Sequence, residues 1–141
     1  MLLIFLTCLS VAMATVSECP PEVASFDYET ALNSADVVFV GTPTSGQSSI
    51  GTDDELREVT YTFSNIDVDE YFKDTTGRNA NSVRILLTTT GTEPCQNAPT
   101  PGQISLIFAR GSTILTIDSC NYGYPWECVP ESARAILSGS K

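Results

Sequence analysis

The five cysteines are the side chains of this sequence with the most direct chemical consequences. They are Cys8, Cys19, Cys95, Cys120 and Cys128. Cys8 lies in an apolar leader that we expect to be removed, so four cysteines remain. An even number of cysteines in a short secreted chain predicts two disulfides. Metal binding by the thiolates is less favoured, because no C-x-x-C pair occurs and an oxidising compartment consumes free thiols.

The first 14 residues predict a secretory signal peptide. Residues 2–14 are nearly all apolar and uncharged, and Ala12-Met13-Ala14 has the small-x-small pattern of a cleavage site. About 13 apolar residues are too few to span a bilayer, which takes roughly 20. We therefore expect a secreted, extracellular protein whose single domain comprises residues 15–141.

Charge and composition exclude several classes of function. The chain has no histidine, which excludes a Ser-His-Asp or Cys-His catalytic unit and a His-ligated zinc. Its net charge of −10 disfavours nucleic acid and anionic membranes as partners.

Acidic residues gather in two short clusters. Asp53, Asp54 and Glu55 form one, and Asp67, Asp69 and Glu70 form the other. Both are interpreted as solvated clusters, or at most as a loose calcium site, because no pair stands out for acid–base chemistry. We expect no enzyme activity, no cofactor and no metal of the protein's own.

Five segments rich in Val, Ile, Thr, Tyr and Phe predict strands. They are residues 36–42, 58–68, 82–90, 104–110 and 113–119. Three Gly-, Ser-, Asn- or Pro-rich segments predict loops, at residues 42–54, 74–81 and 91–103. Arg110-Gly111-Ser112 predicts a tight hairpin, and two short helices are expected at residues 26–33 and 131–137, the second ending at Gly139. This pattern predicts an all-β fold with small α content, an OB-type five-stranded Greek-key barrel with short N-terminal and C-terminal helices.

Several motifs recur in an order that resembles a known family. They are Cys19-Pro20-Pro21, residues 34–41 (SADVVFVG), residues 61–73 from Tyr-Thr-Phe to Tyr-Phe-Lys, Cys95, and residues 120–126 (CNYGYPW). Together they resemble the netrin-like (NTR) module of the tissue inhibitors of metalloproteinases (TIMPs) and their shorter TIMP-like relatives. The resemblance covers nearly the whole chain after the leader and implies an OB barrel.

The resemblance also implies a function and a site. In the family, N-terminal residues form a wedge that fills the active-site cleft of a metalloproteinase. The free N-terminal cysteine of the family chelates the protease zinc through its α-amine and carbonyl oxygen. The corresponding inhibitory segment here is Ser17, Glu18, Cys19, Pro20, Pro21 and Glu22. The implied partner is a secreted zinc metalloproteinase.

The sequence departs from the family at the chelating residue. Cys19 matches the second family cysteine, and Ser17 replaces the first. Cleavage after Ala14 also leaves Thr15 and Val16 ahead of Ser17, which displaces the α-amine by about 7 Å of chain. An alternative is therefore a secreted netrin-like module that binds another extracellular protein, through residues 42–54 and 91–103, without zinc chelation.

The resemblance also implies a disulfide pattern. Cys19–Cys120 with Cys95–Cys128 is the favoured pairing, and Cys19–Cys95 with Cys120–Cys128 is the rival. For Trp126 and Tyr124, stacking of a ligand is considered, but a tryptophan after the last strand is more often an anchor that covers the end of the barrel.

Overall fold

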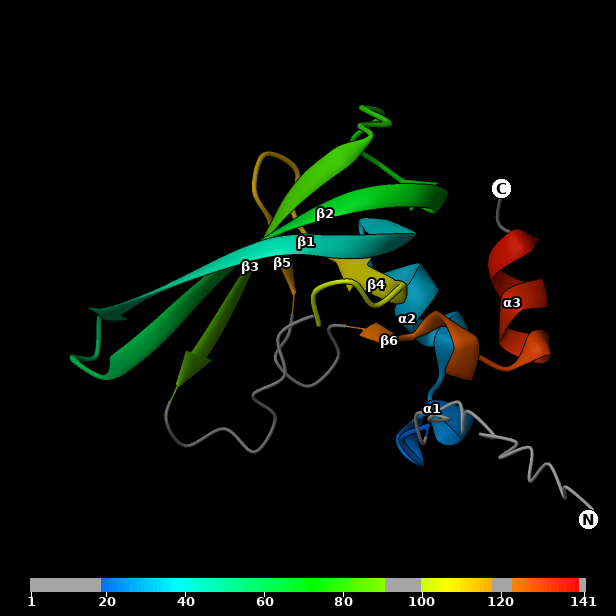
Figure 1. Ribbon diagram of the computed structural model, residues 1–141, viewed down its shortest axis with the longest axis horizontal. Helices are drawn as coiled ribbons and strands as arrows, with labels where there is room; N and C mark the ends of the chain where they lie inside the picture. Colours follow the sequence, from blue (N-terminus) through cyan, green and yellow to red (C-terminus); the bar gives the residue numbers. More distant parts are fainter. Residues whose placement is uncertain (1–18, 91–99, 118–122, 140–141) are drawn as a thin grey trace, which may run out of the picture.

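The computed structural model describes residues 19–90, 100–117 and 123–139. The predicted signal peptide, residues 1–14, and the site residues Ser17 and Glu18 lie outside these ranges, as do Cys95 and Cys120. Within these ranges, ten helices and strands follow one another (Figure 1). They are α1 (Glu22–Ser25), α2 (Tyr28–Ser34), β1 (Val37–Thr52), β2 (Glu58–Asp74), β3 (Ser82–Thr90), β4 (Ser105–Ala109), β5 (Leu115–Ile117), β6 (Gly123–Pro125), the 3-10 helix η1 (Trp126–Cys128) and α3 (Glu131–Ser138).

The strands form one sheet that curls into a barrel. Its order is β5-β3-β2-β1-β4-β6, and all neighbours are antiparallel except β3 and β5. An antiparallel bridge between Arg110 and Thr116 joins the end of β4 to β5 through backbone hydrogen bonds of 2.9 and 2.8 Å. This bridge closes a circuit of five strands, β1-β2-β3-β5-β4, as in a partly open Greek-key barrel of the OB type. The prediction of an all-β fold with small α content is confirmed; β6 is a sixth strand that was not predicted.

The barrel and the helices create two separate hydrophobic cores in the part of the chain that the structure describes. One fills the barrel and comprises Val37, Phe39, Ile66, Ile85, Leu87, Ile107, Ala109, Leu115 and Ile117. The other lies between the sheet and the helices and comprises Val23, Tyr28, Leu32, Ala35, Val38, Val40, Phe72, Leu106, Phe108, Val129, Ala133 and Leu137. All five residues of β4 are buried, and the side chains from Leu106 to Ala109 alternate between these two cores.

Gly41 permits a close approach between β1 and β2. A Cβ atom at this position would lie 2.7 Å from the carbonyl oxygen of Asp67 and 2.7 Å from Cγ2 of Ile66. One of these contacts is with backbone, which cannot move aside as a flexible side chain can. A side chain at residue 41 would therefore push the two strands apart.

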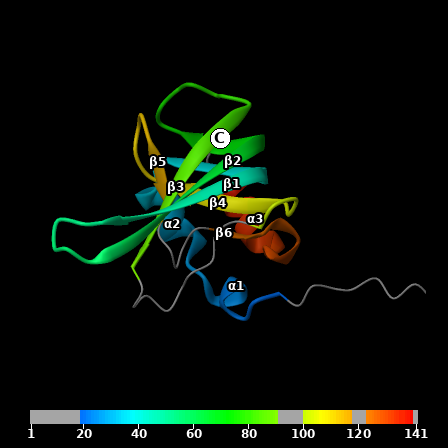
Figure 2. The same cartoon turned by 60° about the vertical axis from the view of Figure 1, so that its left-hand side comes forward.

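The long β1 strand corrects the prediction of a loop at residues 42–54. β1 continues to Thr52, and β2 pairs with it along its whole length. Side chains also meet across the pair, as in the hydrogen bond of 3.1 Å between Ser48 and Thr62. Cross-strand pairing overrides the low strand propensity of Gly, Ser and Pro. Figures 1 and 2 show the resulting hairpin extending away from the helices.

The other boundaries differ less from expectation. β3 has the predicted bounds, β2 runs six residues further than predicted, to Asp74, and β4 is shorter at both ends than residues 104–110. The predicted hairpin at Arg110 is a wider turn, in which Gly111 has φ 112° and donates its amide to Asp36 Oδ2 at 2.8 Å. Residues 118–119 of the fifth predicted strand lie outside the described residues.

The helices begin and end where local chemistry favours it. α2 begins after Asp27, whose carboxylate accepts the amide of Thr30 at 3.0 Å. α3 follows Pro130 and ends at Ser138, one residue beyond the predicted 131–137, with the predicted stop Gly139 as its C-cap. The short helix α1 was not predicted. Across residues 19–90, 100–117 and 123–139, no helix is long and apolar enough to cross a membrane.

Candidate protein-binding surface

A disulfide between Cys19 and Cys128 fixes the start of the described chain. Both pairings expected for Cys19, with Cys120 and with Cys95, are therefore wrong. The reason is β6, which pairs with β4 and leads into η1, where the amide of Trp126 donates to the carbonyl of Ile104 at 2.9 Å. This path brings Cys128 to the N-terminal segment.

The segment Cys19–Glu22 is exposed between two anchors. The first anchor is the disulfide at Cys19, and the second is Val23, whose side chain is buried in the core under the helices. The carbonyl of Pro20 accepts the amide of Val23 at 3.1 Å, which starts the turn that becomes α1. All four residues of the segment are exposed. The structure therefore presents Pro20, Pro21 and Glu22 on a short, doubly fixed stretch of chain.

A cavity of about 750 Å³ lies beside this segment. Glu22 and Ser25 of α1 line it, together with residues from α2, β4 and β5. Its apolar wall includes Phe26, whose ring centroid lies 5.6 Å from that of Phe108 and 4.9 Å from that of Tyr124. The volume falls in the range of sites that bind small molecules or protruding side chains. Sequence reasoning missed this cavity, because its aromatic lining residues Phe26, Phe108 and Tyr124 are far apart in the sequence.

Charged groups border the cavity. Glu22, Asp27 and Arg110 contribute to its lining. The side-chain hydroxyl of Thr30, at 2.7 Å, and the amide of Thr30 hold the pKa of Asp27 below its ordinary range. Asp27 thus carries its charge at physiological pH, and the cavity combines an apolar wall with a polar, mostly acidic border.

Trp126 serves the structure of the C-terminal segment. Its ring lies 5.8 Å from that of Phe72 and 4.3 Å below the guanidinium of Arg134. Arg134 Nη2 also donates to the carbonyl of Trp126 at 2.6 Å. Trp126 thus anchors the C-terminal segment against the core between the sheet and the helices, rather than covering the end of the barrel as expected. Tyr124, by contrast, lines the cavity.

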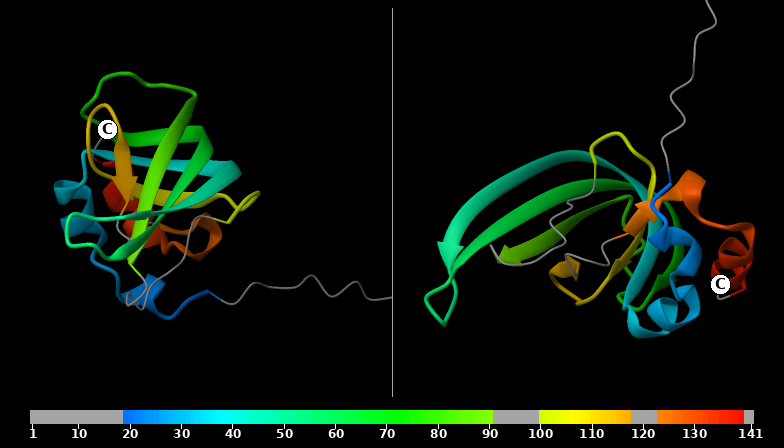
Figure 3. Two further views of the ribbon diagram at one scale, coloured as in Figure 1. Left: turned by 90° about the vertical axis from the view of Figure 1, so that its left-hand side faces the viewer. Right: turned by 90° about the horizontal axis from the view of Figure 1, so that it is seen from below.

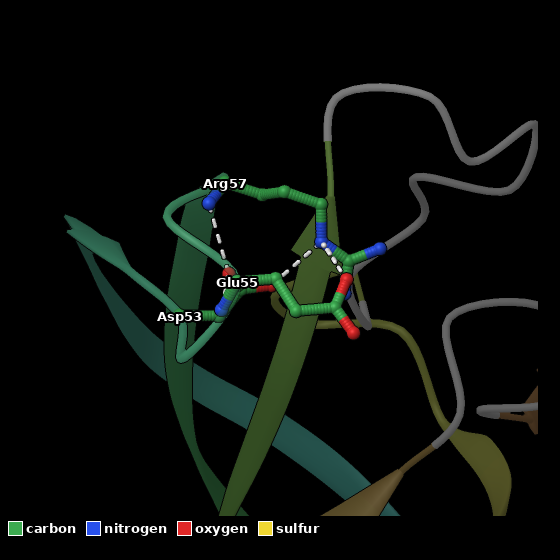
Figure 4. Close-up of polar contacts among 3 residues, drawn as sticks. All are labelled: Asp53, Glu55 and Arg57. Carbon is green, nitrogen blue, oxygen red and sulfur yellow. Dashed lines mark hydrogen bonds and ion pairs between the residues drawn. The ribbon is translucent and has the colours of Figure 1, made fainter.

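The acidic cluster at residues 53–55 forms the tip of the β1–β2 hairpin. Asp53 Oδ1 accepts the amides of Glu55 and Arg57, each at 2.9 Å, and Oδ2 accepts Arg57 Nε at 2.9 Å (Figure 4). Glu55 lies 3.3 Å from the same guanidinium. These contacts shape a turn. Among the residues that the structure describes, no group of three or more Asp, Glu, Cys or His side chains is placed to hold a metal ion.

Residues 42–54 and 91–103 were both expected to be loops that bind a partner, and the structure describes them differently. Residues 42–52 belong to β1, as described above, and Asp53 and Asp54 belong to the hairpin tip. Of residues 91–103, only residues 100–103 are described; there the amide of Gly102 donates to the carbonyl of Pro43 at 2.8 Å. None of the described residues of either segment lines the cavity beside Cys19–Glu22.

Comparison with known proteins adds no assignment. No protein-family model matches this sequence, and a search of curated proteins finds no match.

Proposed function

We propose that this chain is a secreted TIMP-like protein that binds a zinc metalloproteinase through its N-terminal segment. The observation that supports this most is the exposed segment Cys19–Glu22, fixed at one end by the Cys19–Cys128 disulfide and at the other by buried Val23. The OB-type barrel agrees with the fold that the sequence resemblance implies. Under this proposal we assign the chain no catalytic activity and no cofactor.

The segment Cys19–Glu22 suits insertion into a cleft because it has little conformational freedom left to lose on binding. Proline fixes φ at two successive positions, Pro20 and Pro21, and both ends of the segment are tethered. A segment that is already ordered avoids the entropy cost that a flexible loop pays when it binds. The neighbouring cavity, with Phe26 in its wall, offers a place for an apolar side chain from the rim of the protease cleft.

Zinc ligation by the α-amine is not part of the proposal. Ser17 stands where the family has its chelating cysteine, and a mature chain that begins at Thr15 places the amine two residues further away. Binding then rests on shape and on the contacts of Cys19–Glu22. We expect inhibition to be weaker than that of a chelating inhibitor, because an occupied cleft still leaves the zinc with its water.

Charge reversal at Glu22 tests this proposal. The mature protein would be titrated against a panel of secreted zinc metalloproteinases, together with Glu22→Arg and the matched control Glu29→Arg. Both glutamates are exposed, and each lies in the first turn of a short helix. We expect Glu22→Arg to change binding by at least about tenfold and Glu29→Arg to leave it unaltered. Equal effects of the two variants would contradict a site at the N-terminal segment.

A second candidate function is a netrin-like module that binds another extracellular protein without inhibiting a protease. The cavity bordered by Glu22, Asp27 and Arg110 favours it, because such a site can receive a side chain from any partner of suitable shape. Binding that depends on Glu22, without loss of protease activity at saturation, would support this alternative over the first.

A further inference from the structure

The outer edge of β1 is open over half the length of the strand. β4 pairs with β1 only from Val37 to Gly41, whereas β2 follows β1 as far as Thr52. From Ser45 to Thr52 the register with β2 is continuous, and no described strand lies on the other side. Figure 3 shows β1 at the margin of this extended part of the sheet. The edge therefore presents a row of backbone donors and acceptors for another strand.

This edge lacks the devices that usually prevent strand pairing. β1 contains no charged residue anywhere between Val37 and Thr52, although the chain carries a net charge of −10. Its only proline, Pro43, precedes the open part, and the irregularities in its register end at Ser45. Natural proteins commonly protect a long open edge with lysine, proline or a bulge. None of these occurs from Ser45 to Thr52.

We propose that the chain forms a dimer by antiparallel pairing of this edge with the same edge of a second copy. The two-fold axis would pass near Ser48, which lies in the middle of the open part of β1. In that register Ile50 of each copy lies opposite Gly46 of the other. The Ile50 side chain is 72% exposed in the single chain, and a glycine opposite leaves room to cover it.

The same register keeps the acidic tips apart. Asp53, Asp54 and Glu55 of each hairpin lie beyond Thr52 and point to opposite ends of the paired strands. Between the two Asp54 residues there are about 12 residues of strand, or roughly 40 Å at ~3.4 Å per residue. That separation is several times the Debye length of about 8 Å at physiological salt, so repulsion between the tips is screened. The negative charge of this protein therefore does not prevent a second copy from pairing with this edge.

Sedimentation of the full mature chain tests the dimer. We expect the mass to rise from monomer to dimer over about a hundredfold range of concentration, as for any reversible association. Ser48→Lys places two like charges at the axis and should weaken dimerisation by at least about tenfold. The matched control is Ser138→Lys, at an exposed position of α3, which should leave dimerisation unaltered.

A cross-link gives a second measurement that does not depend on loss of folding. Ser48→Cys should form a disulfide-linked dimer under mild oxidation, because a residue on the axis faces its own copy, and Ser138→Cys should not. Circular dichroism verifies that each variant is folded. The proposal would be overturned by a natural chain that stays monomeric throughout, by a dimer that tolerates Ser48→Lys, or by a Ser48→Cys variant that cross-links no faster than the Ser138→Cys variant.

Discussion

The hydroxyl of Tyr28 donates a buried hydrogen bond of 2.7 Å to the carbonyl of Val23. This bond ties the end of the exposed segment Cys19–Glu22 to α2, and through α2 to the sheet. Phe26, between the two residues, packs edge-on against Tyr28 with ring centroids 5.0 Å apart. The position of the candidate binding segment thus depends on one phenol as well as on one disulfide.

Tyr28→Phe should lower the free energy of unfolding at neutral pH by about 1–2 kcal/mol, because it leaves a buried carbonyl without its donor. It should also alter stability at high pH. Burial, with a smaller effect of Tyr124, raises the pKa of Tyr28 from 10.0 to about 12. The folded state favours the protonated phenol. Its contribution to the free energy of unfolding is therefore complete below pH 10 and is lost as the pH rises from 10 to about 12.

Urea unfolding of both proteins from pH 8 to pH 12 checks this prediction. The difference in unfolding free energy between the natural chain and Tyr28→Phe should shrink as pH rises through the interval from about 10 to 12. A difference that is constant across that interval would show that Tyr28 does not titrate as its burial requires.

Removal of the Cys19–Cys128 disulfide should destabilise the protein strongly. The bond spans 109 residues, and closing so long a loop restricts the unfolded chain. The double variant Cys19→Ser with Cys128→Ser should lose about 3–5 kcal/mol of unfolding free energy. Thermal and urea unfolding of the variant measure the loss. A change of less than about 1 kcal/mol would mean that the bond contributes little to the folded state.

Once the predicted signal peptide is removed together with Cys8, the two cysteines other than Cys19 and Cys128 should pair with each other. Four cysteines allow three pairings, and only one contains Cys19–Cys128. The parallel register of Leu87 with Ile117 runs β3 and β5 side by side in the same direction, toward Cys95 and Cys120 respectively. Non-reducing peptide mapping should therefore recover Cys95 linked to Cys120. Recovery of either as a free thiol would contradict this pairing.

Asp53→Asn should loosen the hairpin tip without unfolding the protein. The backbone hydrogen bond from Arg57 is the main cause that holds the pKa of Asp53 below its ordinary value of 3.8. The folded state favours the carboxylate form of Asp53. Its contribution to the stability of the hairpin tip is therefore present above pH 3.8 and is lost as the pH falls through the lowered pKa. In Asp53→Asn the amides of Glu55 and Arg57 should exchange faster with deuterium at pH 7, whereas Asp54→Asn should leave them unaltered.

The sequence predicted the barrel better than the surface. The content of Val, Thr, Tyr and Phe in residues 58–68 was enough to locate β2, although its burial does not alternate simply: Phe63 is half-buried, whereas Ser64 and Ile66 are buried. Residues 42–52 were missed as strand because their conformation comes from pairing with β2 rather than from their own propensity.

The candidate site depended on contacts that a linear pattern does not reveal. The partner of Cys19 could not be predicted because it depends on β6, a strand of only three residues. The pairing of β6 with β4 directs the chain so that Cys128 lies beside Cys19. The cavity escaped notice for a similar reason: its wall joins Phe26 to Phe108 and Tyr124, which are far apart in the sequence. The binding segment was predicted at residues 17–22 and stays a prediction; of these residues the structure describes Cys19–Glu22, which are exposed.

Competition with a small zinc-chelating inhibitor tests the central proposal most directly. A metalloproteinase that binds the mature protein would be saturated with the inhibitor, which occupies the active-site cleft, and the affinity for the protein measured again. If Cys19–Glu22 enters the cleft, the inhibitor should abolish binding, and the protein should in turn slow inhibitor association. Binding of undiminished affinity to the inhibited protease would place the contact elsewhere and contradict a TIMP-like function for this segment.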